Sequence, residues 1–168
     1  DRESGCGSLE EQTTGSVDPP LSGGFFMPAT CIHPEKLRAY LATEYRLGHT
    51  GQAIVLTVGQ RSDQLAMLFS STGVDCVAFL TAYNPFGTQQ SDALNQQAHA
   101  LLATRLTGLE LQTIEESGSE PESNWPAEQS YFALGMSLAN ARAVGAEFKQ
   151  DGIIWAGRNA TLELILLR

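Results

Sequence analysis

Two features are scarce in this sequence of 168 residues, and each scarcity excludes a class of partner. No apolar run approaches the roughly 18–20 residues that a membrane-spanning helix needs, so we expect no membrane partner. Basic residues are few: ten Lys and Arg stand against 19 Asp and Glu, giving a formal net charge of −9. A chain this acidic lacks the basic face that binds a nucleic-acid polymer, although one Arg could still hold a single phosphate.

Cysteine residues and nucleotide-binding motifs are scarce as well. Cys6, Cys31 and Cys76 are odd in number and lack the spacing of a metal site. This cysteine usage favours a reducing cytoplasm over a disulfide-linked secreted domain. The glycine-rich motifs of phosphate-binding and dinucleotide-binding loops, and the G-x-S-x-G motif of hydrolases, are missing. The sequence therefore predicts no metal and no cofactor.

Apolar residues, by contrast, make up 42% of the chain, which is enough for one globular domain with a core. Residues 1–26 are rich in Gly, Ser, Thr and acids and show no apolar periodicity, so we expect a disordered leader. Gly23 and Gly24 can also be encoded as a ribosome-binding sequence, in which case Met27 is the natural start. In both cases we expect residues 27–168 to form a single α/β domain.

The spacing of apolar residues, together with typical helix-start and helix-stop residues, predicts the elements of this domain. The predicted helices cover 33–46, 62–73, 91–107 and 137–150. The predicted strands cover 53–58, 75–83, 109–114, 128–135, 152–157 and 161–167. The apolar face of the third helix is expected to carry Leu94, Ala98, Leu101, Leu102 and Leu106.

The topology follows from the composition of the strands and of their connections. The run 75–83 is nearly all apolar, which is typical of a strand buried on both faces of a parallel sheet. We therefore predict a mixed six-stranded sheet flanked by about four helices, with the first three strands parallel. The connection 115–127 has no helical pattern, so the fourth strand should run antiparallel to the third. A turn over 157–160 makes the last two strands an antiparallel hairpin.

These strand directions bring polar residues from three segments to one edge of the sheet. In open α/β sheets, ligands collect beyond the carboxyl ends of the strands. Asn84 follows the second strand, Glu128 begins the fourth and Gln150 precedes the fifth, so we expect the three to share a rim. The other candidate ligand-binding residues are their neighbours and the nearby cations: Tyr83, Trp125, Ser130, Arg46 and Arg61.

Each of these polar residues also has a purely structural interpretation. Asn84 precedes a proline and can shape a turn as readily as it can contact a ligand. Asn95 is either solvated or locks that turn. Glu128 is either a rim carboxylate in water or an acid/base group whose aromatic surroundings alter its pKa. Gln150 is either a helix-end residue or an amide aimed at the site.

Four segments together resemble a known family: YLATEYR, AFLTAYNPFG, WPAEQSYFALG and FKQDGIIWAG. They are similar to the small bacterial proteins grouped as domain of unknown function 3293, and the likeness covers about residues 37–167. The resemblance implies a stand-alone, cytoplasmic bacterial domain and carries no established activity. The residues that fall on the family motif are Thr81, Tyr83, Asn84, Pro85, Trp125, Glu128, Ser130, Phe148 and Gln150.

Two classes of function are compatible with these observations. The first is a cytoplasmic enzyme or ligand-binding protein for a small polar metabolite or a nucleotide-like ligand, with Glu128 as the acid/base group and Asn84 and Gln150 orienting the ligand. The second is a non-catalytic interaction or neutralising module, in which the acidic loop 115–124 binds a protein partner by mimicking an anion. The sequence leaves open whether the protein is an enzyme.

Overall fold

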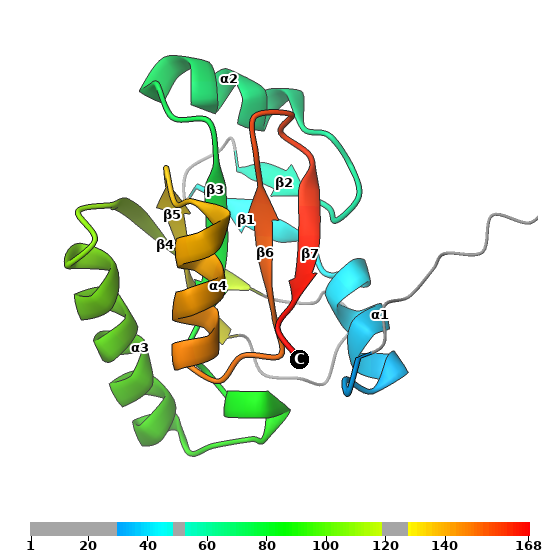
Figure 1. Cartoon of the computed structure of the whole chain (residues 1–168), viewed down its shortest axis with the longest axis vertical. Coiled ribbons are helices and arrows are strands. Elements are labelled where there is room, and N and C mark those ends of the chain that lie inside the picture. The colour runs from blue at the N-terminus through cyan, green and yellow to red at the C-terminus, as the bar shows by residue number, and fades with distance from the viewer. Residues whose placement is uncertain (1–29, 49–52, 119–127) are drawn as a thin grey trace, which may run out of the picture.

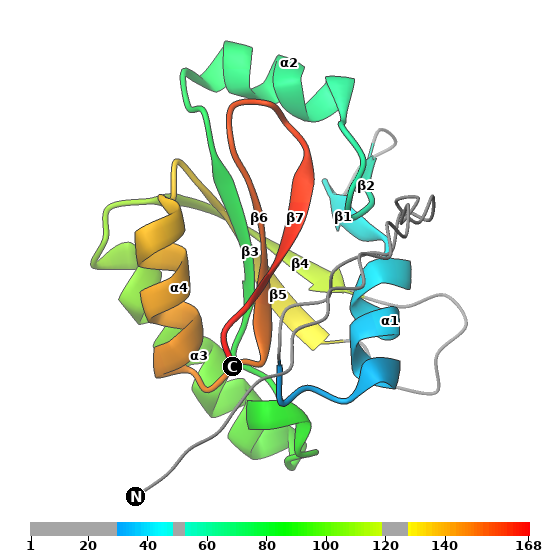
Figure 2. The same cartoon turned by 45° about the vertical axis from the view of Figure 1, so that its right-hand side comes forward.

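The chain folds into three layers around a five-stranded antiparallel sheet (Figures 1 and 2). A computed structural model describes residues 30–48, 53–118 and 128–168, so the expected leader over 1–26 lies outside the described residues. The strand order of the sheet is β4-β5-β3-β6-β7. These strands are β3 (Val77–Thr81), β4 (Gln112–Gly118), β5 (Glu128–Leu134), β6 (Gly152–Ala156) and β7 (Leu162–Leu166).

Each face of this sheet is covered by a different layer. On one face lie α3 (Asp92–Thr107) and α4 (Leu138–Glu147), whose buried residues pack against Ala78, Leu80 and Ala133. The other side carries the remaining elements (Figure 2): α1 (Pro34–Ala42), the small sheet of β1 (Tyr45–Leu47) and β2 (Ile54–Leu56), and α2 (Asp63–Thr72). β3 is therefore buried on both faces, and its apolar sequence reflects this.

The helices begin where serine side chains satisfy their free N–H groups. Ser62, Ser91 and Ser137 each precede a helix and accept a hydrogen bond from a backbone N–H in its first turn. Pro34 opens α1, where a missing N–H costs nothing, and Gly73 ends α2 with φ 75°. These starts and stops confirm the predicted positions of the helices to within a few residues.

The predicted parallel arrangement of the first three strands is wrong. The first of them, β2, is not in the main sheet and pairs antiparallel with β1. β3 and β4 do run in the same direction, but β5 lies between them and pairs antiparallel with both. The six-stranded sheet is thus replaced by sheets of two and five strands. The expected antiparallel steps, β4 to β5 and the β6–β7 hairpin, are present.

The predicted apolar face of α3 also needs correction. Leu102 and Leu106 are buried, but Leu94 and Leu101 are 53% and 58% exposed. Two polar residues, Asn95 and His99, take their place on the inner face. The His99 ring stacks on that of Tyr131, and its Nε2 lies 2.9 Å from a carboxylate oxygen of Glu115. Hydrogen bonding, rather than apolar burial, therefore sets the orientation of the first half of this helix.

Candidate functional site

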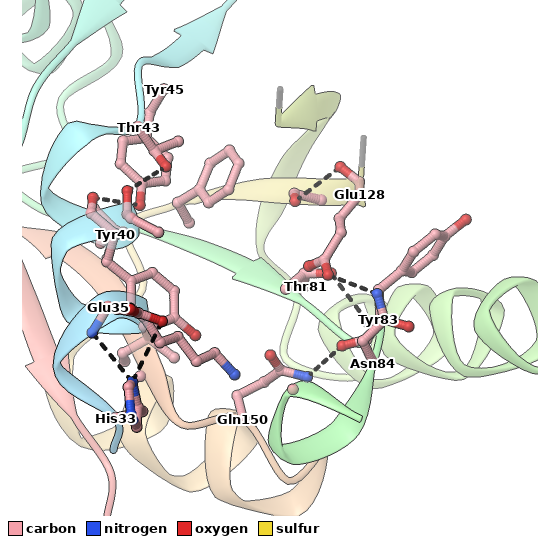
Figure 3. A pocket seen from close by; sticks show the side chains of 18 residues that line it. His33, Glu35, Tyr40, Thr43, Tyr45, Thr81, Tyr83, Asn84, Glu128 and Gln150 are labelled. Carbon is pink, nitrogen blue, oxygen red and sulfur yellow. Dashed lines mark hydrogen bonds and ion pairs between the residues drawn. The ribbon is translucent and has the colours of Figure 1, made fainter. Parts of the chain in front are cut away.

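A cavity of about 670 Å³ opens between α1 and the end of the main sheet (Figure 3). Its polar wall is formed where β3 ends, β5 begins and β6 begins, because antiparallel pairing brings these three points together. Asn84, Glu128 and Gln150 line this wall, as the strand positions predict. Phe79, Ser130 and Ile154 line it from within the sheet. The volume is in the range that suits a small organic ligand.

Asn84 holds the carboxylate of Glu128 in place. Its side-chain Nδ2 donates to Glu128 Oε1 at 2.7 Å. The other groups of Asn84 are bound behind the cavity: its backbone N–H donates to Asn95 Oδ1 at 2.9 Å, and its own Oδ1 accepts from Asn95 Nδ2 at 3.1 Å and from the backbone N–H of Gln90 at 3.0 Å. Asn95 therefore locks the turn, which resolves its alternative interpretations in favour of a structural contact.

The backbone at this turn adopts left-handed conformations that side chains other than glycine seldom take. Asn84 has φ 48° and Phe86 has φ 51°, and Lys149, in the facing connection, has φ 54°. The backbone N–H of Phe86 donates to the carbonyl of Lys149 at 2.7 Å, which ties the two connections to each other. Such conformations cost on the order of 1–3 kcal/mol each and cluster at functional sites. The cavity rim is therefore a place where strain is concentrated.

Gln150 is buried and is held by two backbone carbonyls. Its Nε2 donates to the carbonyl oxygen of Tyr83 at 3.1 Å and to that of Phe148 at 3.2 Å. Both amide protons are thereby used, and Figure 3 shows the opposite oxygen turned into the cavity. α4 ends before this residue, at Glu147, so the amide belongs to the connection and not to the predicted helix.

The remaining candidates on the sheet side differ in their contribution. Ser130 is only 1% exposed and lines the cavity, and its hydroxyl lies 3.5 Å from the carbonyl oxygen of Glu128. Tyr83 also lines the cavity, but its ring packs edge-on against His99 and its hydroxyl donates to Gln129 Oε1 at 2.7 Å. Tyr83 is thus chiefly engaged on the other side of the sheet end.

Three predicted ligand-binding residues are not brought to the cavity by the described structure. Trp125 lies outside the described residues. Arg46 is on β1 with its side chain exposed and paired with Glu44 at 2.9 Å. Arg61 pairs with Asp63 and bridges to Thr161, at the hairpin end of β7 and far along the sheet from Gly152. Neither arginine lines the cavity.

The opposite wall, which the sequence did not predict, comes from one face of α1. Lys36, Tyr40 and Thr43 recur at spacings of four and three residues and all line the cavity. In the sequence these positions read as part of a helix packed on a core, with Tyr45 continuing it. The helix instead ends at Ala42, and Tyr45 begins β1. The polar residues Lys36, Tyr40 and Thr43 at helical spacing are the feature of the sequence that could have indicated this wall.

Lys36 connects α1 to the sheet through a buried carboxylate. Its ammonium group is paired with Asp151, which is 1% exposed and is paired on its other oxygen with Arg168. Gly87, with φ 69°, gives the lysine room, because a Cβ at this position would overlap the ammonium nitrogen. The one described lysine at the cavity is thus already balanced by a carboxylate.

Tyr40 reports the electrostatic character of the cavity. Burial raises the pKa of its hydroxyl well above the usual range, and the negative charges of Asp151 and Glu128 raise it further, while Arg168 lowers it. Burial disfavours the charged phenolate, and nearby carboxylates repel it. The hydroxyl is therefore kept protonated, and the two carboxylates outweigh the arginine at this position.

The described residues contain no group of three or more His, Cys, Asp or Glu that could hold a metal ion. None of the helices in the described part of the chain combines the length and the hydropathy that crossing a bilayer requires.

Fold and site together define a mixed α and β domain in which an antiparallel sheet, covered on both faces, carries a polar cavity at one end of its strands. Residues 80–153 match the family described as Protein of unknown function (DUF3293), so the resemblance seen in the sequence is confirmed over that segment. No curated protein and no solved structure matches this chain. The matched segment includes Asn84, Glu128 and Gln150.

Proposed function

We propose that the cavity binds a small polar organic molecule and that Glu128 accepts a proton or a hydrogen bond from it. The observation that carries this proposal is the hydrogen bond from Asn84 to Glu128, made by a buried residue in a strained conformation. If Asn84 served only the turn, its side-chain Nδ2 would not need to point at the Glu128 carboxylate on the cavity wall. Positioning of a reactive group explains this arrangement.

Proton abstraction is the chemistry that these groups support best. A carboxylate at a fixed position can act as a general base once a ligand places an acidic proton within about 3 Å of it. Asn84 is an uncharged donor, so its hydrogen bond orients Glu128 and leaves the negative charge in place. In the described structure the Ser130 hydroxyl contacts a backbone carbonyl oxygen and not a histidine or lysine base, so a serine nucleophile has no support.

A polar metabolite fits the cavity better than a nucleotide-like ligand. A phosphate group requires free cations or a helix N-terminus. Arg46 and Arg61 lie elsewhere, and Lys36 is paired with Asp151. These three cations are paired or distant, which favours a polar metabolite over a ligand that carries phosphate.

The alternative, an interaction module that uses the acidic loop 115–124, gains no support from the described part of that loop. Glu115 contacts His99, and Glu116 accepts the backbone N–H of Gly48 at 2.7 Å. Both acids therefore serve the fold. The rest of the loop lies outside the described residues.

We place the protein in a reducing, cytoplasmic compartment of a bacterium, in keeping with its composition and family resemblance. Cys31 and Cys76 are free thiols in the described structure, which agrees with this location.

The test is a melting-temperature screen of the full chain against a panel of metabolites, repeated on Glu128→Gln. This substitution removes the charge but keeps the size of the side chain. We expect the variant to melt within a few degrees of the wild type and to bind any ligand found at least about tenfold more weakly, or ~1.4 kcal/mol. Glu163→Gln, an exposed residue on β7, is the matched control and should bind like the wild type. Equal ligand affinity in the wild type and Glu128→Gln would contradict the proposal.

A further inference from the structure

Gln150 presents the cavity with a hydrogen-bond acceptor. Its Nε2 protons are donated to Tyr83 and Phe148, so only Oε1 remains to face inward. No described residue donates to this oxygen, and Gln150 is 6% exposed. With both amide protons committed, this side chain can offer a ligand only an acceptor. Figure 3 shows this oxygen and the Glu128 carboxylate on the same side of the cavity.

Three of the hydroxyl groups around the cavity have also given their protons to the backbone. Thr43 donates to the carbonyl of Ala39 at 2.8 Å, Tyr45 to that of Tyr40 at 3.2 Å, and Thr81 to that of Gln129 at 2.9 Å. A hydroxyl that has donated its only proton can offer a ligand only its lone pairs. The polar lining formed by these groups, together with Glu128 and Gln150, is therefore made of acceptors.

The charges and rings around the cavity favour a cation. Lys36 and Arg168 are both paired with Asp151, and Asn84, which donates to Glu128, is a neutral amide. The raised pKa of Tyr40, due first to burial and then to Asp151 and Glu128, agrees with a negative potential in the cavity. The rings of Tyr40, Tyr45 and Phe79 line it as well. Aromatic faces attract cations and pack against apolar groups.

Taking the proposed small-molecule function as given, we propose that the ligand is an organic cation: a protonated amine on an apolar, preferably aromatic, body. Its ammonium group donates to Glu128 and to Oε1 of Gln150, and its body lies between α1 and the sheet, against Tyr40 and Phe79. In this position either an N–H proton of the ammonium group or a C–H proton of the adjoining carbon lies next to the Glu128 carboxylate, which Asn84 orients.

The test compares three probes that share a phenylalkyl body and differ in the end group: phenethylamine, 2-phenylethanol and 3-phenylpropionate. Titration calorimetry on the full chain should give the amine a dissociation constant at least tenfold below those of the alcohol and the acid. Glu128→Gln and Gln150→Leu should each abolish this preference, and the control Glu163→Gln should keep it. Raising the salt concentration should weaken binding of the amine and leave the alcohol unaffected.

The possible outcomes separate this inference from the proposed function. If the alcohol or the acid binds as tightly as the amine, or if the amine does not bind, the cation preference is refuted. If, in addition, the metabolite screen finds an uncharged or anionic ligand that depends on Glu128, the proposed function stands without the cation preference. If neither panel yields a ligand that depends on Glu128, both proposals fail. The salt dependence of the wild type decides the question should Gln150→Leu fail to fold.

Discussion

Asn84 is the residue on which the polar wall of the cavity depends. Its side chain and its backbone N–H make four hydrogen bonds, three of them to groups behind the cavity and one to Glu128. Asparagine tolerates the left-handed conformation better than most residues because its short polar side chain can hydrogen-bond locally. Aspartate would keep the shape and the acceptor role, but it lacks the donor. Asparagine therefore meets two requirements at this position: it tolerates the left-handed turn, and it donates a hydrogen bond to Glu128.

An exchange of donor and acceptor tests this hydrogen bond directly. Asn84→Asp puts a carboxylate oxygen against Glu128, so we expect the free energy of unfolding to fall by about 1–3 kcal/mol. In the double variant Asn84→Asp, Glu128→Gln, the new glutamine amide can donate to the new aspartate. We expect this variant to recover most of the loss. Urea unfolding at neutral pH provides the four free energies of the double-mutant cycle.

The single variant Glu128→Gln completes the cycle and supplies the control. It keeps an oxygen that can accept from Asn84, so its cost should be small. If the double variant is as unstable as the sum of the two single variants, the two side chains do not interact in solution, and Asn84 serves the turn alone.

At the scale of elements, α1 is joined to the sheet through a buried carboxylate. Asp151 precedes β6 and is 1% exposed, whereas the side chains of Lys36 and Arg168 are 33% and 41% exposed. If Asp151 is removed, both cations can turn to water. If both cations are removed, the carboxylate stays buried without them, which is the more expensive state.

This asymmetry predicts an order of stabilities. Asp151→Asn should cost about 1–2 kcal/mol, because the two cations it releases are partly solvated. The double variant Lys36→Met, Arg168→Met should cost about 3–5 kcal/mol, because it strands a buried charge. Adding Asp151→Asn to that double variant should restore part of the loss. Urea unfolding of the three variants checks the order, and an Asp151→Asn variant less stable than the double variant would overturn this account.

Elements with strong local signals could be predicted from the sequence, and elements without them could not. α2 and α3 follow serine caps and apolar spacing, and β3 follows a continuous apolar run. β1 has three residues and no turn signal of its own, so the apolar spacing predicts a helix that includes Tyr45. In α3 the contact of Asn95 with Asn84 was one of two open interpretations, whereas the inner position of His99 was not predicted, because its partner Glu115 lies on a separate strand.

At the scale of the whole molecule, burial on both faces explains why the strand directions were predicted wrongly. β3 lies between the layer of α3 and α4 and the layer of α1, α2 and the small sheet. A strand covered on both faces is apolar throughout, whichever way its neighbours run. Asn84, Glu128 and Gln150 nevertheless line one cavity, because their positions depend on where β3 ends and β5 and β6 begin. Antiparallel pairing brings these points together just as well.

The cavity itself is a property of the whole molecule and not of the matched segment alone. Asn84, Glu128 and Gln150 lie within residues 80–153, whereas the facing wall of Lys36, Tyr40 and Thr43 comes from α1, outside that segment. The family-like segments around Asn84, Glu128 and Gln150 point to the first wall, whereas YLATEYR, which contains Tyr40 and Thr43 of the second wall, is interpreted from the sequence as part of a helix. Only the chain path from α1 through β1 places it opposite the sheet.

The stability of the whole molecule in alkaline solution provides the last prediction. The pKa of Tyr40 is raised in the folded state, first by burial and then by Asp151 and Glu128. In the unfolded chain a tyrosine ionises near pH ~10. The folded protein therefore holds this proton more tightly, so Tyr40 contributes its full stabilisation below about pH 10 and loses it as the pH rises further.

Tyr40→Phe has no proton to lose, so its melting temperature, relative to its own value at pH 7, should fall less steeply than that of the wild type between about pH 9 and 11.5. Absorbance of tyrosinate in the folded wild type should show one late-titrating tyrosine that the variant lacks. Parallel melting curves for the two proteins would mean that Tyr40 is open to water and that the cavity does not exclude solvent from α1.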